Sequence, residues 1–192
     1  MKPFKILTDD YFVGNFGSVE ATDEVLKNCK KNFSDDDMIE GTIGDDREVD
    51  TKIRKCKTGG IPVDSINFIN EGLKRTIMHV NDMRWKMDLK NEWESLIQYT
   101  RYRGEGHFYG WHQDSYRDGE YAAGVDRQLT IVYCLSYKKD YSGGEFEVRR
   151  RDKSVYSRKF DYGDFIVFPA IQLHRVKPLK SGNRTTLVGW YM

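Results

Sequence analysis

Hydrophobic and polar residues change their spacing near residue 90. Before this point, apolar side chains recur every three or four positions, which is typical of helices with one buried face. Beyond it, short apolar runs alternate with glycine, aspartate and asparagine, which is typical of strands joined by tight turns. We therefore expect N-terminal helices followed by a C-terminal β-structure.

Two helices are predicted in the first part. The shorter one lies between Thr22 and Lys31, with acidic residues at its start and lysines at its end, as the helix dipole favours. Asp64 or Ser65 is expected to cap the longer one, because short polar side chains bond the first backbone N–H groups of a helix. The apolar stripe of this helix comprises Ile66, Ile69, Leu73, Ile77 and Val80. Between the helices we expect loop, with a short strand around residues 49–56.

The second part is expected to contain eight strands, separated by turns such as Ser142-Gly143-Gly144 and Ser181-Gly182-Asn183. Eight short strands with tight connections suggest a sandwich or barrel of antiparallel sheet. The predicted strands are residues 93–103, 107–115, 127–137, 144–151, 154–160, 164–168, 173–178 and 184–191.

Length and charge narrow the class of protein. The 192 residues suit one domain, spanning residues 1–192. With 31 basic and 30 acidic residues the net charge is +1, which argues against nucleic acid as a partner. The longest apolar run, Phe165 to Ile171, is far shorter than the roughly 20 residues of a membrane-spanning helix. Three cysteines without a CxxC pair indicate reduced thiols, so we expect a cytoplasmic protein without membrane contact.

His112 and Asp114 form the first candidate for chemistry. Residues two apart in a strand face the same side, so this imidazole and carboxylate could share a metal ion. On its own the pair has a commoner explanation, a hydrogen-bonded His–Asp pair without a metal.

His174 strengthens the metal interpretation. It follows an apolar strand and a proline break, and in a folded sheet this strand can return beside His112. Two histidines and one carboxylate form the facial ligand set that suits non-haem Fe(II) and leaves coordination positions open. A structural zinc site would need a fourth ligand, and the nearby candidate, Cys134, lies in an apolar run.

Arg184 adds a fixed positive charge. On the last strand it shares one face with Thr186, Val188 and Trp190. If that face points inward, the guanidinium is costly to bury without an anion, and a dicarboxylate ligand would satisfy it. The alternatives are a buried ion pair with an acidic residue and an exposed arginine at a sheet edge.

The combination of these motifs resembles the Fe(II)- and 2-oxoglutarate-dependent oxygenases, in their prolyl-4-hydroxylase-like (PKHD-type hydroxylase-like) branch. The first motif runs from Tyr102 to Asp114 and the last from His174 to Arg184, followed by Trp190. The resemblance covers roughly residues 91–192, with a looser match at Asp50–Cys56. Some relatives carry a cosubstrate-binding tyrosine where this chain has Cys134.

The resemblance implies a mainly β fold with flanking helices. The expected architecture is a double-stranded β-helix, a jelly-roll or cupin-like squashed barrel with N-terminal helices packed on one sheet. Residues 1–90 would then support the barrel formed by residues 91–192, and residues 41–60 could form a lid over a peptide.

The resemblance also implies the roles of individual residues. His112, Asp114 and His174 would bind Fe(II) and form the catalytic centre. Arg184 would bind 2-oxoglutarate, and Arg127 and Trp190 would line the substrate entrance. Further candidates for cosubstrate binding are Tyr102, Thr186 and Tyr133.

The implied reaction is hydroxylation of a substrate C–H by O₂, coupled to decarboxylation of 2-oxoglutarate to succinate and CO₂. Prolyl residues in a protein or peptide are the leading substrate, and ascorbate (vitamin C) is a further candidate cofactor. The alternatives are a hydroxylase of a free amino acid or other small molecule, and a non-catalytic metal-binding module. We expect a monomer or a homodimer.

Overall fold

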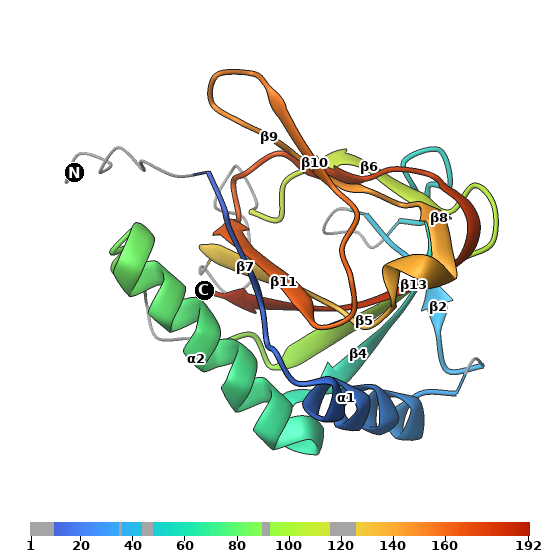
Figure 1. The fold of residues 1–192 in the computed structure, drawn as a ribbon, viewed down its shortest axis with the longest axis horizontal. Helices are drawn as coiled ribbons and strands as arrows, with labels where there is room; N and C mark the ends of the chain where they lie inside the picture. The colour runs from blue at the N-terminus through green and yellow to red at the C-terminus, as the bar shows by residue number, and fades with distance from the viewer. Residues whose placement is uncertain (1–9, 35, 44–47, 90–92, 116–125) are drawn as a thin grey trace.

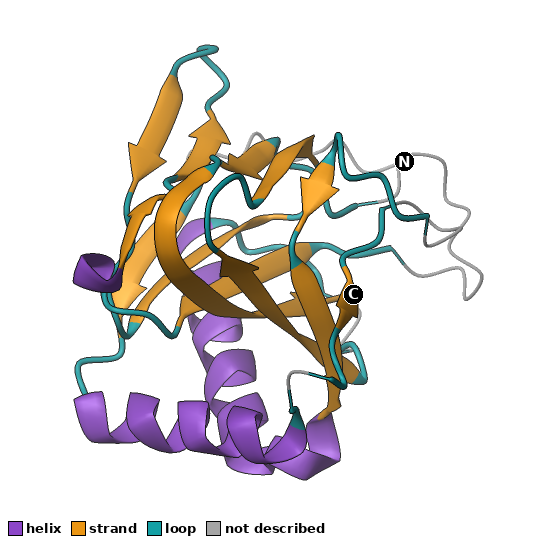
Figure 2. Ribbon diagram, turned by 90° about the vertical axis from the view of Figure 1, so that its right-hand side faces the viewer, coloured by secondary structure: helices purple, strands orange, loops and turns teal. Residues whose placement is uncertain are grey.

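The computed structural model describes residues 10–34, 36–43, 48–89, 93–115 and 126–192. Two antiparallel sheets face each other, and both long helices lie on one side of them (Figures 1 and 2). Among the described residues, each sheet has its own hydrogen-bonded ladder. The expected squashed barrel is therefore two facing sheets that are not closed into one continuous sheet. In the part of the chain that the structure describes, no helix has the length and apolar character needed to span a bilayer.

The larger sheet has eight strands in the order β1-β11-β7-β13-β5-β4-β2, with β8 paired to β13. Its members are β1 (Phe12–Asn15), β2 (Ile39–Glu40), β4 (Lys57–Pro62), β5 (Leu96–Arg103), β7 (Leu129–Cys134), β8 (Tyr141–Gly143), β11 (Asp164–Pro169) and β13 (Leu179–Tyr191). The smaller sheet has the order β10-β9-β12-β6-β3. Its members are β3 (Arg54–Lys55), β6 (Phe108–His112), β9 (Phe146–Arg149), β10 (Val155–Arg158) and β12 (His174–Val176).

All eight predicted strands are present, but the prediction for the N-terminal part is incomplete. The short strand expected around residues 49–56 is present as β3, whereas residues 57–62, expected to be loop, form β4; each extends one sheet. The first part of the chain therefore helps to build both sheets besides supporting them with helices. The lid expected at residues 41–60 is described only in part, because residues 44–47 lie outside the described residues.

The helices begin at places that differ from the prediction. Ser18 caps α1 (Val19–Asn32), and its side chain accepts a hydrogen bond from the Ala21 N–H. The predicted caps of the second helix are wrong: Asp64 and Ser65 lie in the 3₁₀ turn η1 (Val63–Ile66), which precedes α2 (Asn67–Arg84). The Val63 N–H bonds to the Ser95 carbonyl, so the chain stays tied to the sheet until it makes this tight turn. A second 3₁₀ turn, η2, spans Lys138–Asp140.

Strand alternation divides the interior into two cores. On β7, Ile131 and Tyr133 belong to the outer core, in which the larger sheet packs against α1 and α2. Val132 and Cys134 belong to the inner core between the sheets. All five side chains of the stripe predicted on the second helix are buried, with Ile66 at the end of η1 and the other four on α2. Even- and odd-numbered residues of β7 are therefore committed to different environments.

The break predicted at Ser181-Gly182-Asn183 is wrong. β13 runs through these residues: its first part pairs with β8, and residues 183–191 pair with β5 and β7. Gly182 has φ +79°, a conformation that L side chains rarely adopt, and it lies where the strand passes from one set of partners to the other. This continuity carries Arg184 and Thr186 to the inner face.

Replacing Gly182 by Ala should destabilise the protein more than replacing Gly17, although both have positive φ. A Cβ at Gly182 would collide with the Asp140 carbonyl oxygen and lie 2.7 Å from Tyr141 Cα, whereas one at Gly17 would meet nothing within 4 Å. We expect losses of about 3 kcal/mol and about 1 kcal/mol, respectively, in the free energy of unfolding from urea titrations. Equal losses would contradict this account of the bend in β13.

Candidate active site

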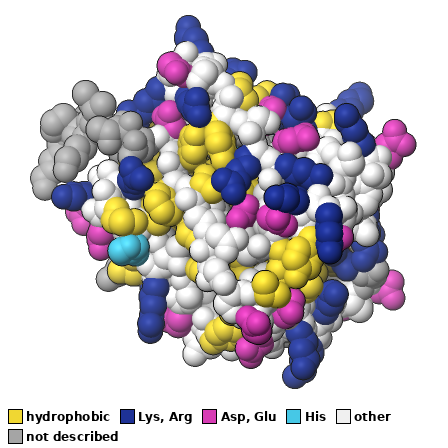
Figure 3. Space-filling model, in the orientation of Figure 1, with side chains coloured by type: hydrophobic (Ala, Val, Ile, Leu, Met, Phe, Trp, Pro, Cys, Tyr) yellow, Lys and Arg dark blue, Asp and Glu magenta, His cyan; other side chains and the backbone are white. Residues whose placement is uncertain are grey.

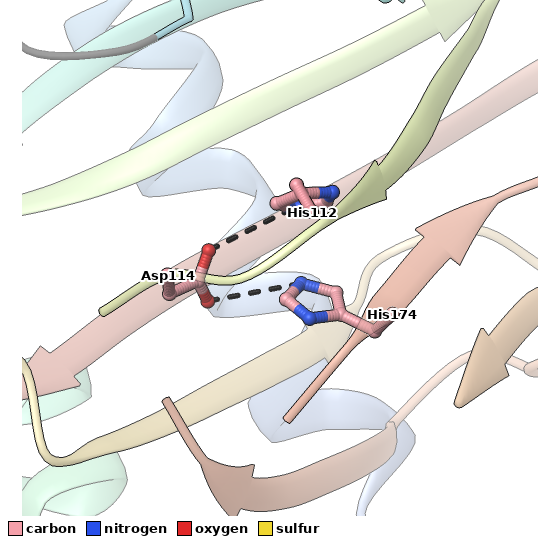
Figure 4. Close-up of side chains that lie close together, drawn as sticks. All are labelled: His112, Asp114 and His174. Atoms are coloured by element: carbon pink, nitrogen blue, oxygen red, sulfur yellow. Dashed lines mark ion pairs between the residues drawn. The ribbon is translucent and has the colours of Figure 1, made fainter. Parts of the chain in front are cut away.

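Three metal-ligand side chains meet between the sheets. His112 ends β6, His174 begins β12 directly opposite it, and Asp114 follows just beyond β6 (Figure 4). Nε2 of His112 lies 3.7 Å from one carboxylate oxygen of Asp114, and Nε2 of His174 lies 3.8 Å from the other. One ligand atom from each residue falls within 4.8 Å of the others. This geometry can hold a single metal ion.

Hydrogen bonds orient the three ligands. Nδ1 of His112 lies 2.8 Å from the Gly110 carbonyl oxygen, and Nδ1 of His174 lies 2.8 Å from the Gln172 carbonyl oxygen. A carbonyl can only accept, so each Nδ1 carries the proton and each Nε2 presents a lone pair to the centre. The Thr130 hydroxyl donates to Asp114 at 2.8 Å. These contacts prepare the ligand atoms for a metal.

The protonation states suit a cation. Burial lowers the pKa of His112 to about 3, and the neighbouring His174 acts in the same direction. Burial alone would raise the pKa of Asp114, but His174, His112 and Arg127 outweigh it and hold that pKa below its usual range. At neutral pH the site therefore offers a neutral His112 and an ionised carboxylate, so protons compete little with a metal.

A cavity of about 850 Å³ connects the three ligands with Arg184. The Arg184 side chain is only 1% exposed, and its Nε and Nη2 have no hydrogen-bond partner among the described residues. A buried guanidinium with two nitrogens that lack an acceptor is unfavourable unless an anion completes it. A carboxylate can accept from both nitrogens at once, so this end of the cavity fits a carboxylate ligand.

Tyr141 is a contact of Arg184 that the sequence analysis missed. Its hydroxyl donates to the Phe160 carbonyl oxygen at 2.6 Å and lies near enough to the Arg184 guanidinium to interact with it electrostatically. Burial raises the pKa of Tyr141, so the phenol stays protonated. Tyr141 lies on β8, and its relation to Arg184 depends on the pairing of β8 with β13. The break predicted at Ser142-Gly143-Gly144 is wrong for its first two residues, which belong to β8, and so this partner strand was missed.

The other cosubstrate candidates divide into two groups. Tyr102 and Thr186 line the cavity with Arg184, and the Tyr102 ring centroid lies 5.4 Å from the Arg184 guanidinium. The structure does not place Tyr133 at the cavity, where a cosubstrate contact was expected. Its hydroxyl donates to Thr22 on α1 at 2.7 Å. The cause is the alternation of β7, which turns Cys134 inward and Tyr133 toward the helices.

Arg127 and Trp190 lie together in the cavity wall. The Arg127 guanidinium stacks 3.8 Å above the Trp190 ring. It also donates to both carboxylate oxygens of Glu94, at 2.9 and 3.0 Å. Glu94 was missed because it lies 33 residues before Arg127 and no motif surrounds it. Arg127 therefore lines the cavity, and its ion pair with Glu94 fixes the position of its guanidinium.

Comparison with known proteins identifies the family. A model described as the 2OG-Fe(II) oxygenase superfamily matches residues 97–192, half of the chain. The chain belongs to this superfamily. The resemblance of the sequence to the prolyl-hydroxylase-like branch is confirmed, because relatives of this chain include proteins named PKHD-type hydroxylase.

Two of these relatives show the extent of the similarity. A protein from Hyphomonas neptunium is 38% identical over 87 residues, covering 45% of this chain and 38% of the relative. One from Gloeothece citriformis is 35% identical over 137 residues, covering 71% and 58%. The chain thus spans less than two thirds of the length of these relatives.

Solved structures of superfamily members confirm the expected double-stranded β-helix fold. A prolyl hydroxylase from Trichoplax adhaerens superposes with a TM-score of 0.80 at 20% identity, covering 96% of this chain and 84% of that one. A prolyl-4-hydroxylase from Pseudomonas putida gives 0.73 at 16% identity, covering 96% and 92%.

Replacing Tyr141 by Phe should weaken 2-oxoglutarate binding by about tenfold, because the Arg184 guanidinium loses the neutral polar group next to it. The dissociation constant is measured by calorimetric titration of the metal-loaded protein. Tyr137→Phe serves as the control, since this partly exposed phenol stacks on Tyr162. An unchanged dissociation constant in Tyr141→Phe would remove Tyr141 from the pocket's function.

Proposed function

We propose that this chain is an Fe(II)- and 2-oxoglutarate-dependent hydroxylase of prolyl residues in a protein or peptide. One arrangement carries the proposal: the ligand set His112, Asp114 and His174 shares a cavity with the buried, incompletely bonded guanidinium of Arg184. Two imidazoles and one carboxylate leave coordination positions open, as an oxygen-activating Fe(II) requires.

The residues fit both groups. His112, Asp114 and His174 would hold Fe(II), and Arg184, next to Tyr141, would bind the far carboxylate of 2-oxoglutarate. When bound, these groups supply the coupled chemistry in which O₂ oxidises 2-oxoglutarate to succinate and CO₂ and hydroxylates a substrate C–H.

The protein's own contribution is orientation and shielding. Thr130 and the carbonyls of Gly110 and Gln172 hold the ligand atoms, as described above. Apolar side chains line the cavity between the ligands and Arg184, and they limit the access of water to the reacting atoms. These side chains are Val132, Phe146, Val176 and Val188.

The charged groups of the cavity favour a peptide over a free amino acid. A free amino acid brings an ammonium and a carboxylate, each of which needs an opposite charge on burial. Among the described lining residues, Glu94 and Arg127 bond each other, and Arg54 donates to the Thr42 carbonyl. Asp114 and Arg184 would be used by the metal and the cosubstrate. An uncharged peptide backbone suits the remaining space.

The rim of the cavity is apolar. Ile39, Ile53 and Leu96 line it while remaining 64%, 41% and 42% exposed, respectively. Exposed apolar side chains that line a cavity are candidates for a binding surface. The Trichoplax adhaerens protein of the same fold was solved in complex with a peptide fragment of hypoxia inducible factor. In this proposal, the open cavity of this chain would receive the peptide.

The expectations on partners and cellular location concern the surface charge and the cysteines. Lys and Arg side chains lie among Asp and Glu side chains on the face in Figure 3, and the net charge is +1. A substrate other than nucleic acid stays a prediction. The three cysteines are free and buried, as expected in a reducing compartment. Cytoplasmic location, ascorbate use and a monomeric or homodimeric state stay predictions.

The first test separates the oxygenase from a non-catalytic metal-binding module. Anaerobic Fe(II) and 2-oxoglutarate should give a weak visible chelate absorption, and air should then yield succinate. His174→Ala should abolish both signals by removing a metal ligand. Arg184→Met should keep metal binding but weaken 2-oxoglutarate binding by about 100-fold or more, since a charged bidentate contact is lost.

Folded, metal-loaded protein that gives neither chelate absorption nor succinate would leave the binding module as the better interpretation. With succinate formation established, proline-containing peptides and free proline are compared for a gain of one oxygen in mass. Hydroxylation of free proline alone would favour the small-molecule alternative.

A second test addresses the apolar rim. Ile39→Asp combined with Ile53→Asp should raise the KM for a hydroxylated peptide by about tenfold or more, because each charge opposes burial of the peptide's apolar groups. The KM for 2-oxoglutarate should not change. Val155→Asp, a matched change at an exposed site on β10, is the control. Equal effects of the two proteins on peptide KM would exclude the rim from substrate binding.

A further inference from the structure

We propose that Tyr109 and Arg54 are positioning residues for the metal ligand His112, through a stack that connects β3 to the metal site. This inference rests on the metal site of the proposed function. It assigns a task to Arg54, a residue of the looser upstream match to which the sequence analysis gave no role.

A bulge in β6 brings Tyr109 to His112. Residues three apart on a regular strand point to opposite faces. Here His112 pairs with His174 and Tyr109 pairs with Val176, so the step of three residues on β6 faces a step of two on β12. The extra residue turns both side chains into the cavity, as a one-residue bulge does.

The rings are in direct contact. The Tyr109 ring and the His112 imidazole stack with centroids 3.5 Å apart and an interplanar angle of 14°. The Arg54 guanidinium lies 4.4 Å from the Tyr109 centroid. Because the imidazole covers one face of Tyr109, the guanidinium occupies the other. Arg54 and Tyr109 are also cross-strand partners of β3 and β6.

Arg54 is itself held on several sides. Its side chain is buried, Nη1 donates to the Thr42 carbonyl at 2.7 Å, and Nε donates to Cys56 Sγ at 3.1 Å. Gly41 packs so closely that a Cβ there would lie 2.6 Å from Arg54 Nε. Arg54 therefore has little room to move, and its position limits the movement of Tyr109.

The stack supplies a restraint that the hydrogen bond of His112 does not. The contact from Nδ1 to the Gly110 carbonyl fixes one ring atom but permits the ring plane to tilt about it. Tyr109 restrains that tilt and so directs Nε2. The two imidazole centroids lie 4.1 Å apart, and His174 has further aromatic support of its own, because Phe168 and Phe146 lie 4.6 and 5.4 Å from its ring centroid. Each histidine ligand is thus oriented by its own aromatic neighbours.

Co(II) titration of the metal-free protein tests the stack without turnover. Tyr109→Leu should weaken Co(II) binding by about tenfold, as losing a residue that orients a ligand does. Tyr109→Phe keeps the ring and should stay within about twofold of the wild type. Arg54→Met should weaken binding, whereas Arg150→Met should not. Arg150 covers the stacked rings of Tyr11 and Tyr156 and is the matched control.

Proton spectra of the Co(II) protein separate positioning from general loosening. The two Nδ1–H protons should give exchangeable, metal-shifted signals. Tyr109→Leu should displace one signal, that of His112, and Phe168→Leu should displace the other. Equal Co(II) affinity of Tyr109→Leu and Tyr109→Phe, or displacement of both signals together in Tyr109→Leu, would overturn the inference. Wild-type protein that binds no Co(II) would overturn the metal site and the proposed function as well.

Discussion

The burial of Arg184 is the constraint on which the rest of the site depends. A guanidinium cannot lose its proton at neutral pH, so a fold that removes it from water must supply acceptors. Here Nε and Nη2 of Arg184 have no acceptor among the described residues and are left for a ligand, and the neutral phenol of Tyr141 lies nearby. An anion that binds Arg184 in the folded state should therefore increase the free energy of unfolding of the protein. The cavity, the inner strand faces and the metal ligands are arranged around that requirement.

Strand alternation and its local exceptions place these groups. A regular period of two residues divides β7 and β13 between the helix-covered core and the cavity, which explains why Thr186 faces Arg184's pocket and Tyr133 does not. Two irregularities then redirect the chain. Gly182 lets β13 pass from β8 to β5, and the bulge in β6 brings Tyr109 onto the same side as His112. The site thus needs both the regular pattern and its interruptions.

The sequence predicts those features that depend on neighbouring residues. The helix stripe, the eight C-terminal strands and the facing of Arg184 with Thr186 all follow from local periodicity, and the structure has them. Contacts between distant segments did not follow. Tyr141 reaches Arg184 only because β8 pairs with β13, and Glu94 meets Arg127 across 33 residues. Such pairings depend on sheet order, which periodicity does not encode.

The two halves of the chain contribute differently to chemistry and selection. The family model begins at residue 97, so the matched half contains all three metal ligands and Arg184. Ile39 and Ile53, which form much of the apolar rim, come from the half before it, as does Arg54. The earlier half can therefore change the rim without altering a metal ligand. Through Arg54 and Tyr109, however, the same segment also contacts His112, so changes to β3 can affect the metal site as well as the substrate entrance.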